Sequence, residues 1–210
     1  GVSQCSEDIG RDKFNKELQM AEYLNDSIQV KLASSNDDSK LQTRQINQMI
    51  DEKVDLLVIA PNQLNTISPA INRAYDKGIP VIIYDRKANS NKYTAFIGCD
   101  NYAIGKSMGE FIAQKLQGKG RVVEIRGLEG SSPALERHRG FMEAMKKYPG
   151  MQVVASEAGD WKEESGKKVM QRILDKTRDF DYVFSHNDRM GWGAYQVVRD
   201  RGLARNYKFT

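Results

Sequence analysis

The chain has 210 residues, of which 40% are hydrophobic and 29% are charged, and its net charge is +4. This length and composition predict a folded protein with a true apolar core, in one large domain or two smaller lobes. Charges of both signs are interspersed and no apolar run reaches the length of a membrane span, so the pattern favours neither a nucleic-acid surface nor a transmembrane segment. No leader sequence precedes Gly1, so we expect that any export signal has been removed or was not included.

The cysteines and histidines do not predict a metal centre. Cys5 and Cys99 form no C-x-x-C motif, and His138 and His186 lie far apart without the spacing of metal ligands. We therefore expect neither a metal nor another cofactor. The sequence leaves open whether the two cysteines form a disulfide.

In the first half of the chain, short apolar runs alternate with amphipathic segments. A polar turn is expected at 6–11. The expected elements are, in order, a strand at 1–5, a helix at 12–25, a strand at 28–32, a helix capped by residue 37 or 38, a strand at 54–60, a helix at 66–77, and strands at 81–84 and 94–98. This order predicts a parallel sheet with right-handed crossovers.

The alternation then begins again. The expected elements are a helix from 101 that ends at the glycines 118 and 120, a strand at 121–126, a helix from 133 to 148, a strand at 151–158, a helix at 163–177, a strand at 182–185, a helix at 190–202 and a final strand at 208–210. The predicted fold class is α/β, with two Rossmann-like lobes at 1–99 and 100–210. We expect a ligand cleft between these lobes, because the carboxyl ends of parallel strands are where ligands bind.

In the first lobe, Asp85 and Arg86 directly follow the apolar strand at 81–84. A carboxylate only accepts hydrogen bonds and a guanidinium only donates them, so the pair can hold several hydroxyl groups of one small polar molecule. The alternative is a surface ion pair that opens a loop.

In the second lobe, three strand ends are followed by polar or aromatic residues. Arg137 lies on the first turn of a helix after a loop of small residues, Trp161 follows the next strand, and Asn187 follows the third. The loop lacks the lysine and the glycine spacing of a phosphate-binding loop. The alternatives are a surface ion pair for Arg137, a hydrophobic lid for Trp161, and helix capping for the Asn187-Asp188 pair, with Asp188 as the expected cap.

No catalytic set is evident, because the serines and histidines lie outside a nucleophile-elbow motif. The three aspartates at strand ends, Asp85, Asp160 and Asp188, are the residues that a glycoside-cleaving enzyme would use. Such an enzyme is the competing class of function, and the expectation is a protein without catalytic activity.

Four motifs together resemble the periplasmic binding protein type 1 family, which includes ribose- and galactose-binding proteins and the effector domains of LacI-type repressors. The motifs are Gly78-Ile79-Pro80-Val81 with Asp85-Arg86, Ile97-Gly98-Cys99-Asp100-Asn101-Tyr102-x-x-Gly105, Gly127-x-x-Gly130-Ser131-Ser132-Pro133-x-x-Glu136-Arg137-x-x-Gly140-Phe141, and Asn187-Asp188-x-Met190-x-x-Gly193-Ala194. The resemblance covers essentially the whole chain.

The resemblance implies a site and a hinge. The residues that it implies for sugar binding are Asp85, Arg86, Arg137, Trp161 and Asn187, together with Glu7 in the first loop. It implies a hinge near Cys99 and Asp100, about which the lobes would close on the sugar. Gly10 stands in the loop where relatives often carry a stacking aromatic residue, and relatives continue well past Thr210, so the resemblance implies that the C-terminal part of the second lobe is missing.

A finer resemblance concerns segments 1–6 and 96–101, which are similar to sensor domains of Bacteroides-type hybrid two-component systems. It implies a periplasmic domain that binds a monosaccharide and signals by lobe closure. The alternatives are the solute-binding protein of a sugar ABC transporter and the effector domain of a LacI-type repressor. The implied partner is a sugar and not a nucleic acid, with a membrane reached only through a parent chain or a transporter. A homodimer and the identity of the sugar stay open.

Overall fold

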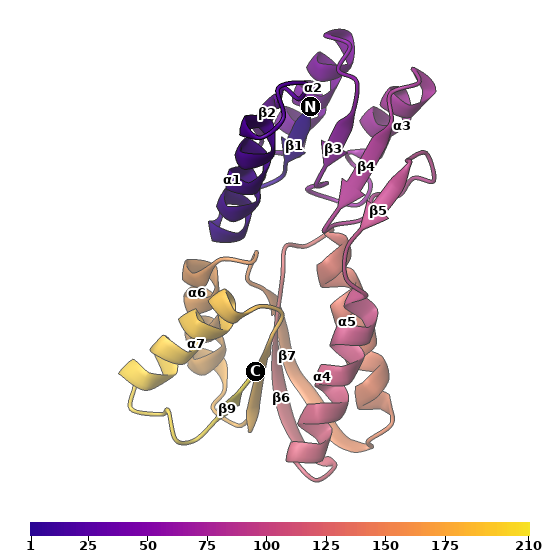
Figure 1. The fold of residues 1–210 in the computed structure, drawn as a ribbon. Coiled ribbons are helices and arrows are strands. Elements are labelled where there is room, and N and C mark those ends of the chain that lie inside the picture. Colours follow the sequence, from indigo (N-terminus) through magenta and orange to yellow (C-terminus); the bar gives the residue numbers. More distant parts are fainter. The chain divides into compact units, whose positions relative to one another are not determined.

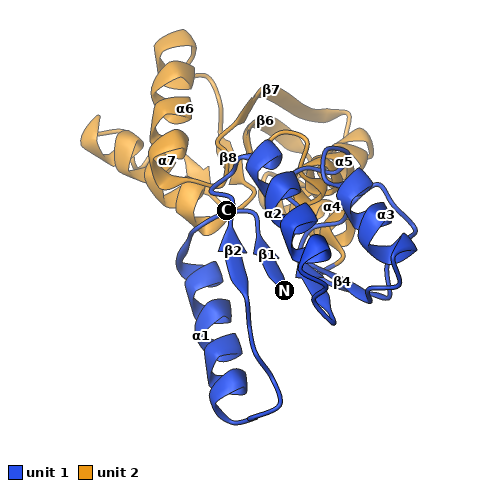
Figure 2. Cartoon of the chain, turned by 90° about the horizontal axis from the view of Figure 1, so that it is seen from above, with its two compact units in different colours: residues 1–99 blue, residues 100–210 orange.

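The computed structural model describes residues 1–210, which divide into two compact units, Gly1–Cys99 and Asp100–Thr210 (Figure 2). Each unit contains a parallel β-sheet with flanking helices (Figure 1). None of the helices is both long and apolar enough to cross a membrane. Cys5 is buried and Cys99 is exposed, and the two do not form a disulfide with each other.

Unit 1 has a five-stranded parallel sheet in the order β2-β1-β3-β4-β5. Its elements are β1 (Val2–Gln4), α1 (Ile9–Tyr23), β2 (Leu32–Ser34), α2 (Ser39–Asp51), β3 (Leu57–Ile59), α3 (Ser68–Asp76), β4 (Val81–Tyr84) and β5 (Ala95–Ile97). Gly78 follows α3 with a φ of 79°, a conformation that glycine adopts without strain, and it turns the chain into β4.

Strands β3 and β4 of unit 1 have apolar or aromatic side chains on both faces. Leu57, Ile59, Val81 and Ile83 pack against α2 and α3 in one buried cluster. Tyr84, whose side chain points to the other face of the sheet, lies in a second buried cluster with Cys5. Phe14 of α1 packs against this cluster. A sheet covered on both faces explains why β4 is an uninterrupted apolar run that ends in a polar pair.

Unit 2 has a four-stranded parallel sheet in the order β7-β6-β8-β9. Its elements are α4 (Asn101–Lys115), β6 (Lys119–Arg126), α5 (Ser132–Lys146), β7 (Gly150–Ala158), α6 (Glu163–Lys176), β8 (Tyr182–Ser185), α7 (Asp188–Asp200) and β9 (Lys208–Phe209). Pro133 lies in the first turn of α5, where its missing N–H costs no hydrogen bond.

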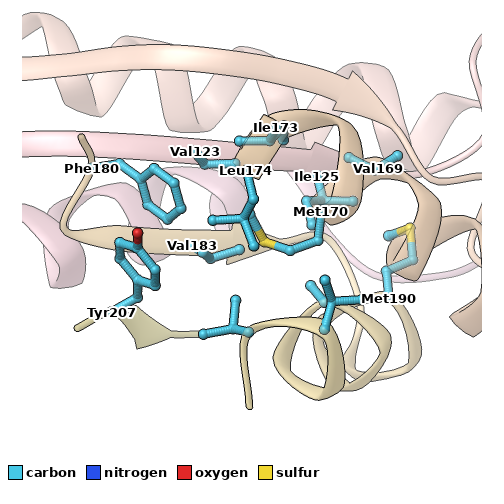
Figure 3. Packing of buried hydrophobic residues seen from close by; sticks show 13 residues of the cluster. Val123, Ile125, Val169, Met170, Ile173, Leu174, Phe180, Val183, Met190 and Tyr207 are labelled. Carbon is cyan, nitrogen blue, oxygen red and sulfur yellow. The ribbon is translucent and has the colours of Figure 1, made fainter. Parts of the chain in front are cut away.

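Alternate residues of β6 face opposite sides of the unit 2 sheet. Val123 and Ile125 pack with residues of α6 and α7 in the cluster that Figure 3 shows. Val122 packs with residues of α4 and α5 on the other side. Glu124 has the parity of Val122, so its carboxylate lies on the α5 side of the sheet.

Among the expected element boundaries that differ from the structure, three have a clear physical cause. Helix α1 begins at Ile9 within the expected turn, because the Asp8 side chain accepts from the backbone N–H of Arg11 at 3.0 Å and caps the helix. Strand β2 begins only at Leu32, where pairing with Val2 of β1 begins, and Ile28 is exposed. Asn187, not Asp188, caps α7, since its side-chain oxygen accepts from the N–H of Met190 at 3.0 Å.

Candidate functional site

At the carboxyl edge of the unit 1 sheet, the guanidinium of Arg11 forms an ion pair with the carboxylate of Asp85. The Arg11 side chain is 10% exposed, whereas that of Asp85 is 52% exposed. Asp85 has a φ of 61°, and its N–H donates to the carbonyl of Ile97 at 2.8 Å. The buried arginine therefore orients a carboxylate that solvent, or a ligand, can reach.

Neighbouring side chains of unit 1 hold the Arg11 guanidinium in place. Its guanidinium donates to the sulfur of Cys5 at 3.5 Å and lies 5.2 Å from the centre of the Tyr84 ring. The Tyr84 hydroxyl donates to the side-chain oxygen of Gln4. Burial raises the pKa of Tyr84 to about 12, against the lowering effect of Arg11, so the hydroxyl stays a donor at neutral pH.

Arg86, which was expected to contact a ligand beside Asp85, is only 5% exposed. Its guanidinium donates to the backbone carbonyl of Asn62 at 3.1 Å. Asn62 is itself held, because its N–H donates to Gln42 at 2.9 Å and its amide nitrogen donates to the carbonyl of Asp37 at 2.8 Å. Arg86 thus ties the end of β4 to the loop after β3, and at most a small part of it faces solvent.

In unit 2, Arg137 on α5 connects three segments. Its Nε donates to the side-chain oxygen of Asn101 at 3.0 Å, and its Nη1 donates to the backbone carbonyl of His186. Its guanidinium also lies 5.6 Å from the centre of the Trp161 ring. Arg137 and Trp161, which follow successive strands, therefore lie together within this unit.

Trp161 lies against the backbone at Gly127, where a Cβ would come within 2.0 Å of the indole ring. The indole N–H is buried and has no hydrogen-bond partner. Asn187 donates from its side-chain nitrogen to the carbonyl of Trp161 at 3.1 Å while it caps α7. An amide has two N–H groups and two lone pairs, so one of each remains for a ligand.

Below these loops, the fully buried carboxylate of Glu124 is the centre of a hydrogen-bonded cluster. Its carboxylate accepts from Ser156 Oγ at 2.6 Å and lies 2.8 Å from His138 Nδ1 and 3.0 Å from His186 Nε2. Burial alone would raise the pKa of Glu124, but the hydrogen bonds from His138, His186 and Ser156 outweigh it and lower the pKa to about 2. Burial lowers the pKa of His186, against the attraction of Glu124, so the pair is a carboxylate with a neutral imidazole.

The remaining expected residues, Glu7, Cys99 and Asp100, lie between regular elements. Glu7 is exposed in the loop between β1 and α1. Cys99 is exposed at the end of unit 1, and Asp100 begins unit 2 as the cap of α4, where its side chain accepts from the N–H of Ala103 at 2.9 Å. No group of acidic, histidine or cysteine side chains is arranged to hold a metal ion.

The sequence interpretation missed Arg11, Asn62 and the Glu124 cluster. The available signal for Glu124 was a lone charge inside the apolar run of β6. Arg11 gave no such signal, because its contact with Asp85 joins residues 74 positions apart. Each unit presents polar groups at a sheet edge, a carboxylate in unit 1 and a guanidinium and an amide in unit 2. Groups of these kinds can hydrogen-bond to hydroxyl groups of a small molecule.

The model of the periplasmic binding protein domain family matches residues 11–210. The chain therefore belongs to that family, which confirms the fold class, the resemblance and the periplasmic location expected from it. The family is one of ligand-binding domains.

Two curated proteins illustrate the relationship. The galactofuranose-binding protein YtfQ of Escherichia coli is 29% identical over 97% of this chain and 66% of its own length. The ribose import binding protein RbsB of Bacillus subtilis is 33% identical over 83% of this chain and 57% of its own length. The chain thus spans less than two thirds of these relatives.

Among solved structures, the fructose-binding periplasmic domain of a hybrid two-component system has a TM-score of 0.95 with this chain. The two are 42% identical, and the match covers 100% of this chain and 70% of the other. The expected similarity to sensor domains of this type is therefore confirmed.

Proposed function

We propose that the chain binds a monosaccharide and is the periplasmic sensor domain of a two-component signalling protein. The observation that carries the sugar-binding part is the half-exposed Asp85 carboxylate, oriented by the buried Arg11 at the carboxyl edge of a parallel sheet. A carboxylate held in this way accepts hydrogen bonds from adjacent sugar hydroxyls without the entropy cost of ordering a free side chain. The proposal assigns Arg137, Trp161, Asn187, Glu7 and, in a minor part, Arg86 to the same sugar.

Fructose is the first candidate ligand, because the 42% identical relative is described as fructose-binding. Galactofuranose and ribose follow, because these are the ligands named for the two curated relatives. Because Gly10, in the first turn of α1, has no aromatic ring that could stack on a sugar, the polar contacts of Asp85, which Arg11 orients, carry more of the recognition.

The test of binding is calorimetric titration of the intact protein with fructose, galactofuranose and ribose. One of these sugars should bind, and Asp85→Ala should abolish the binding while the protein keeps its circular dichroism spectrum. Asp51→Ala, which removes a carboxylate from an exposed ion pair with Arg73 in the same unit, is the matched control and should bind as the unmodified protein does. Binding that survives Asp85→Ala would contradict the assignment, and a sugar recovered as a cleaved or altered product would favour the enzyme alternative.

The signalling role is tested separately from binding. In the intact two-component signalling protein, the bound sugar should change the rate at which the kinase part takes up phosphate from ATP. The proposed hinge at Cys99 and Asp100 predicts a smaller radius of gyration in small-angle scattering once the sugar is added. A protein that binds sugar but incorporates no phosphate would favour the alternative role, a solute-binding protein for a transporter.

A further inference from the structure

Glu124 is a buried charge that none of the proposed sugar contacts uses. Its side chain is fully inaccessible to solvent, in the middle of β6. Ser156 of β7, His138 of α5 and His186 after β8 all contact its carboxylate. A buried carboxylate is costly unless its hydrogen bonds are satisfied, so this cluster is a feature that packing alone does not require.

His186 connects that carboxylate to the β6–α5 loop and to the β8–α7 loop, which carries Asn187. Its Nδ1 lies 3.3 Å from the backbone N–H of Gly127, in the loop between β6 and α5. A backbone N–H only donates, so Nδ1 is the acceptor, and the ring proton sits on Nε2, which faces Glu124 at 3.0 Å. The backbone carbonyl of His186 accepts from Arg137, and Asn187 is the next residue.

We propose that Glu124 is a positioning residue for the unit 2 part of the sugar site. By accepting from His186 Nε2, it fixes the tautomer and the rotation of the imidazole whose Nδ1 accepts from Gly127. The ring then ties the β6–α5 loop to the β8–α7 loop and places the carbonyl that holds Arg137. This inference rests on the proposed sugar-binding function, since Arg137 and Asn187 are the contacts that it positions.

The test compares variants that keep or remove the oxygen of residue 124 that accepts from His186 Nε2. Glu124→Met removes it at similar volume, whereas Glu124→Gln keeps one carbonyl oxygen that can still accept from His186. In His186→Asn the shorter side chain no longer reaches Glu124, so nothing fixes the rotation of the group that accepts from Gly127. Ser156→Ala is the matched control, because it removes a hydrogen bond to Glu124 that leads to neither loop.

Calorimetry with the sugar that the unmodified protein binds should give a dissociation constant at least about tenfold higher for Glu124→Met, the cost of losing one buried hydrogen bond. Glu124→Gln should restore binding to within about threefold, and Ser156→Ala should change the dissociation constant by less than about twofold while it lowers stability. In the Glu124→Met, His186→Asn double variant the two losses should not multiply, because both act through one contact.

A folded Glu124→Met variant with unchanged affinity, or losses that multiply in the double variant, would overturn the inference. Amide hydrogen exchange at Gly127 gives a readout without sugar: it should be faster in Glu124→Met and in His186→Asn, and unchanged exchange would also contradict the proposal. If the unmodified protein binds no sugar, the proposed function fails by itself, and the exchange at Gly127 still decides whether Glu124 ties the loops. His186→Asn carries the same test if Glu124→Met does not fold.

Discussion

The buried guanidinium of Arg11 forms an ion pair with Asp85, which joins the first turn of α1 to the end of β4. The pair is asymmetric, because Arg11 is nearly inaccessible and Asp85 is half exposed. Removing such a buried arginine leaves its carboxylate partner without orientation, whereas a surface pair loses little when it is broken.

Arg11→Met should therefore raise the dissociation constant for sugar by about tenfold to about a hundredfold, which corresponds to the loss of one hydrogen bond to a charged group. Calorimetric titration measures the change. Arg73→Met is the matched control, since Arg73 pairs with Asp51 in an exposed position of the same unit, and its affinity should equal that of the unmodified protein. Equal effects of the two variants would mean that Arg11 has no special role.

Arg137→Lys tests the planar geometry of a guanidinium at constant charge. Arg137 donates to Asn101 and to the carbonyl of His186 and also lies over Trp161, and a lysine ammonium cannot make all three contacts. We expect sugar affinity to fall at least about tenfold. Arg139→Lys, two residues along the same helix, keeps its contact with the Tyr102 ring and should bind normally.

The Glu124 cluster predicts that acid destabilises the protein. The pKa of Glu124 is lowered to about 2 in the folded state, so its contribution is present above its unfolded value of 4.5 and is lost as the pH falls toward 2. His186, whose folded pKa is lowered from 6.5 because it is buried, adds a loss that begins as the pH falls below 6.5. Both effects have the same sign, because the unfolded state binds more protons.

Urea unfolding at several pH values measures this loss. The Glu124 part amounts to about 2 kcal/mol of the free energy of unfolding between about pH 6 and about pH 3. In Glu124→Gln this part should disappear. The difference in unfolding free energy between the variant and the unmodified protein should therefore become smaller as the pH falls. Parallel curves for the two proteins would show that Glu124 has an ordinary pKa.

The space around two helical glycines differs, and this predicts opposite effects for their substitution by alanine. Gly105 lies where α4 approaches α5, whereas Gly191 of α7 has room for a methyl group. A Cβ on Gly105 would lie 2.0 Å from the backbone carbonyl of Arg137, so Gly105→Ala should force the helices apart and cost about 1–3 kcal/mol of unfolding free energy. Gly191 of α7 has its nearest neighbour at 3.4 Å, and Gly191→Ala should stabilise the helix by up to about 1 kcal/mol. Thermal unfolding of both variants checks the signs.

The sequence by itself determined the features that depend on neighbours along the chain. The apolar run of β4 with Asp85 and Arg86 at its end, the turn at Gly78, and Pro133 at the start of α5 are local signals, and the structure contains each of them. Together with the four motifs, they were enough to predict the fold class and the family. Local pattern does not decide between two neighbouring residues that can both cap a helix. Asn187 caps α7, although Asp188 was equally able to do so by residue type.

Only the tertiary structure decided which polar residues act together. Arg11 meets Asp85 across 74 positions, and Glu124 meets His186 across 62 positions. These partners meet because the sheets order their strands as β2-β1-β3-β4-β5 and β7-β6-β8-β9, which brings distant strand ends to one edge. Hydrophobic periodicity reports how each segment is buried but not which strand lies beside it, so long-range polar pairs cannot be read from local pattern.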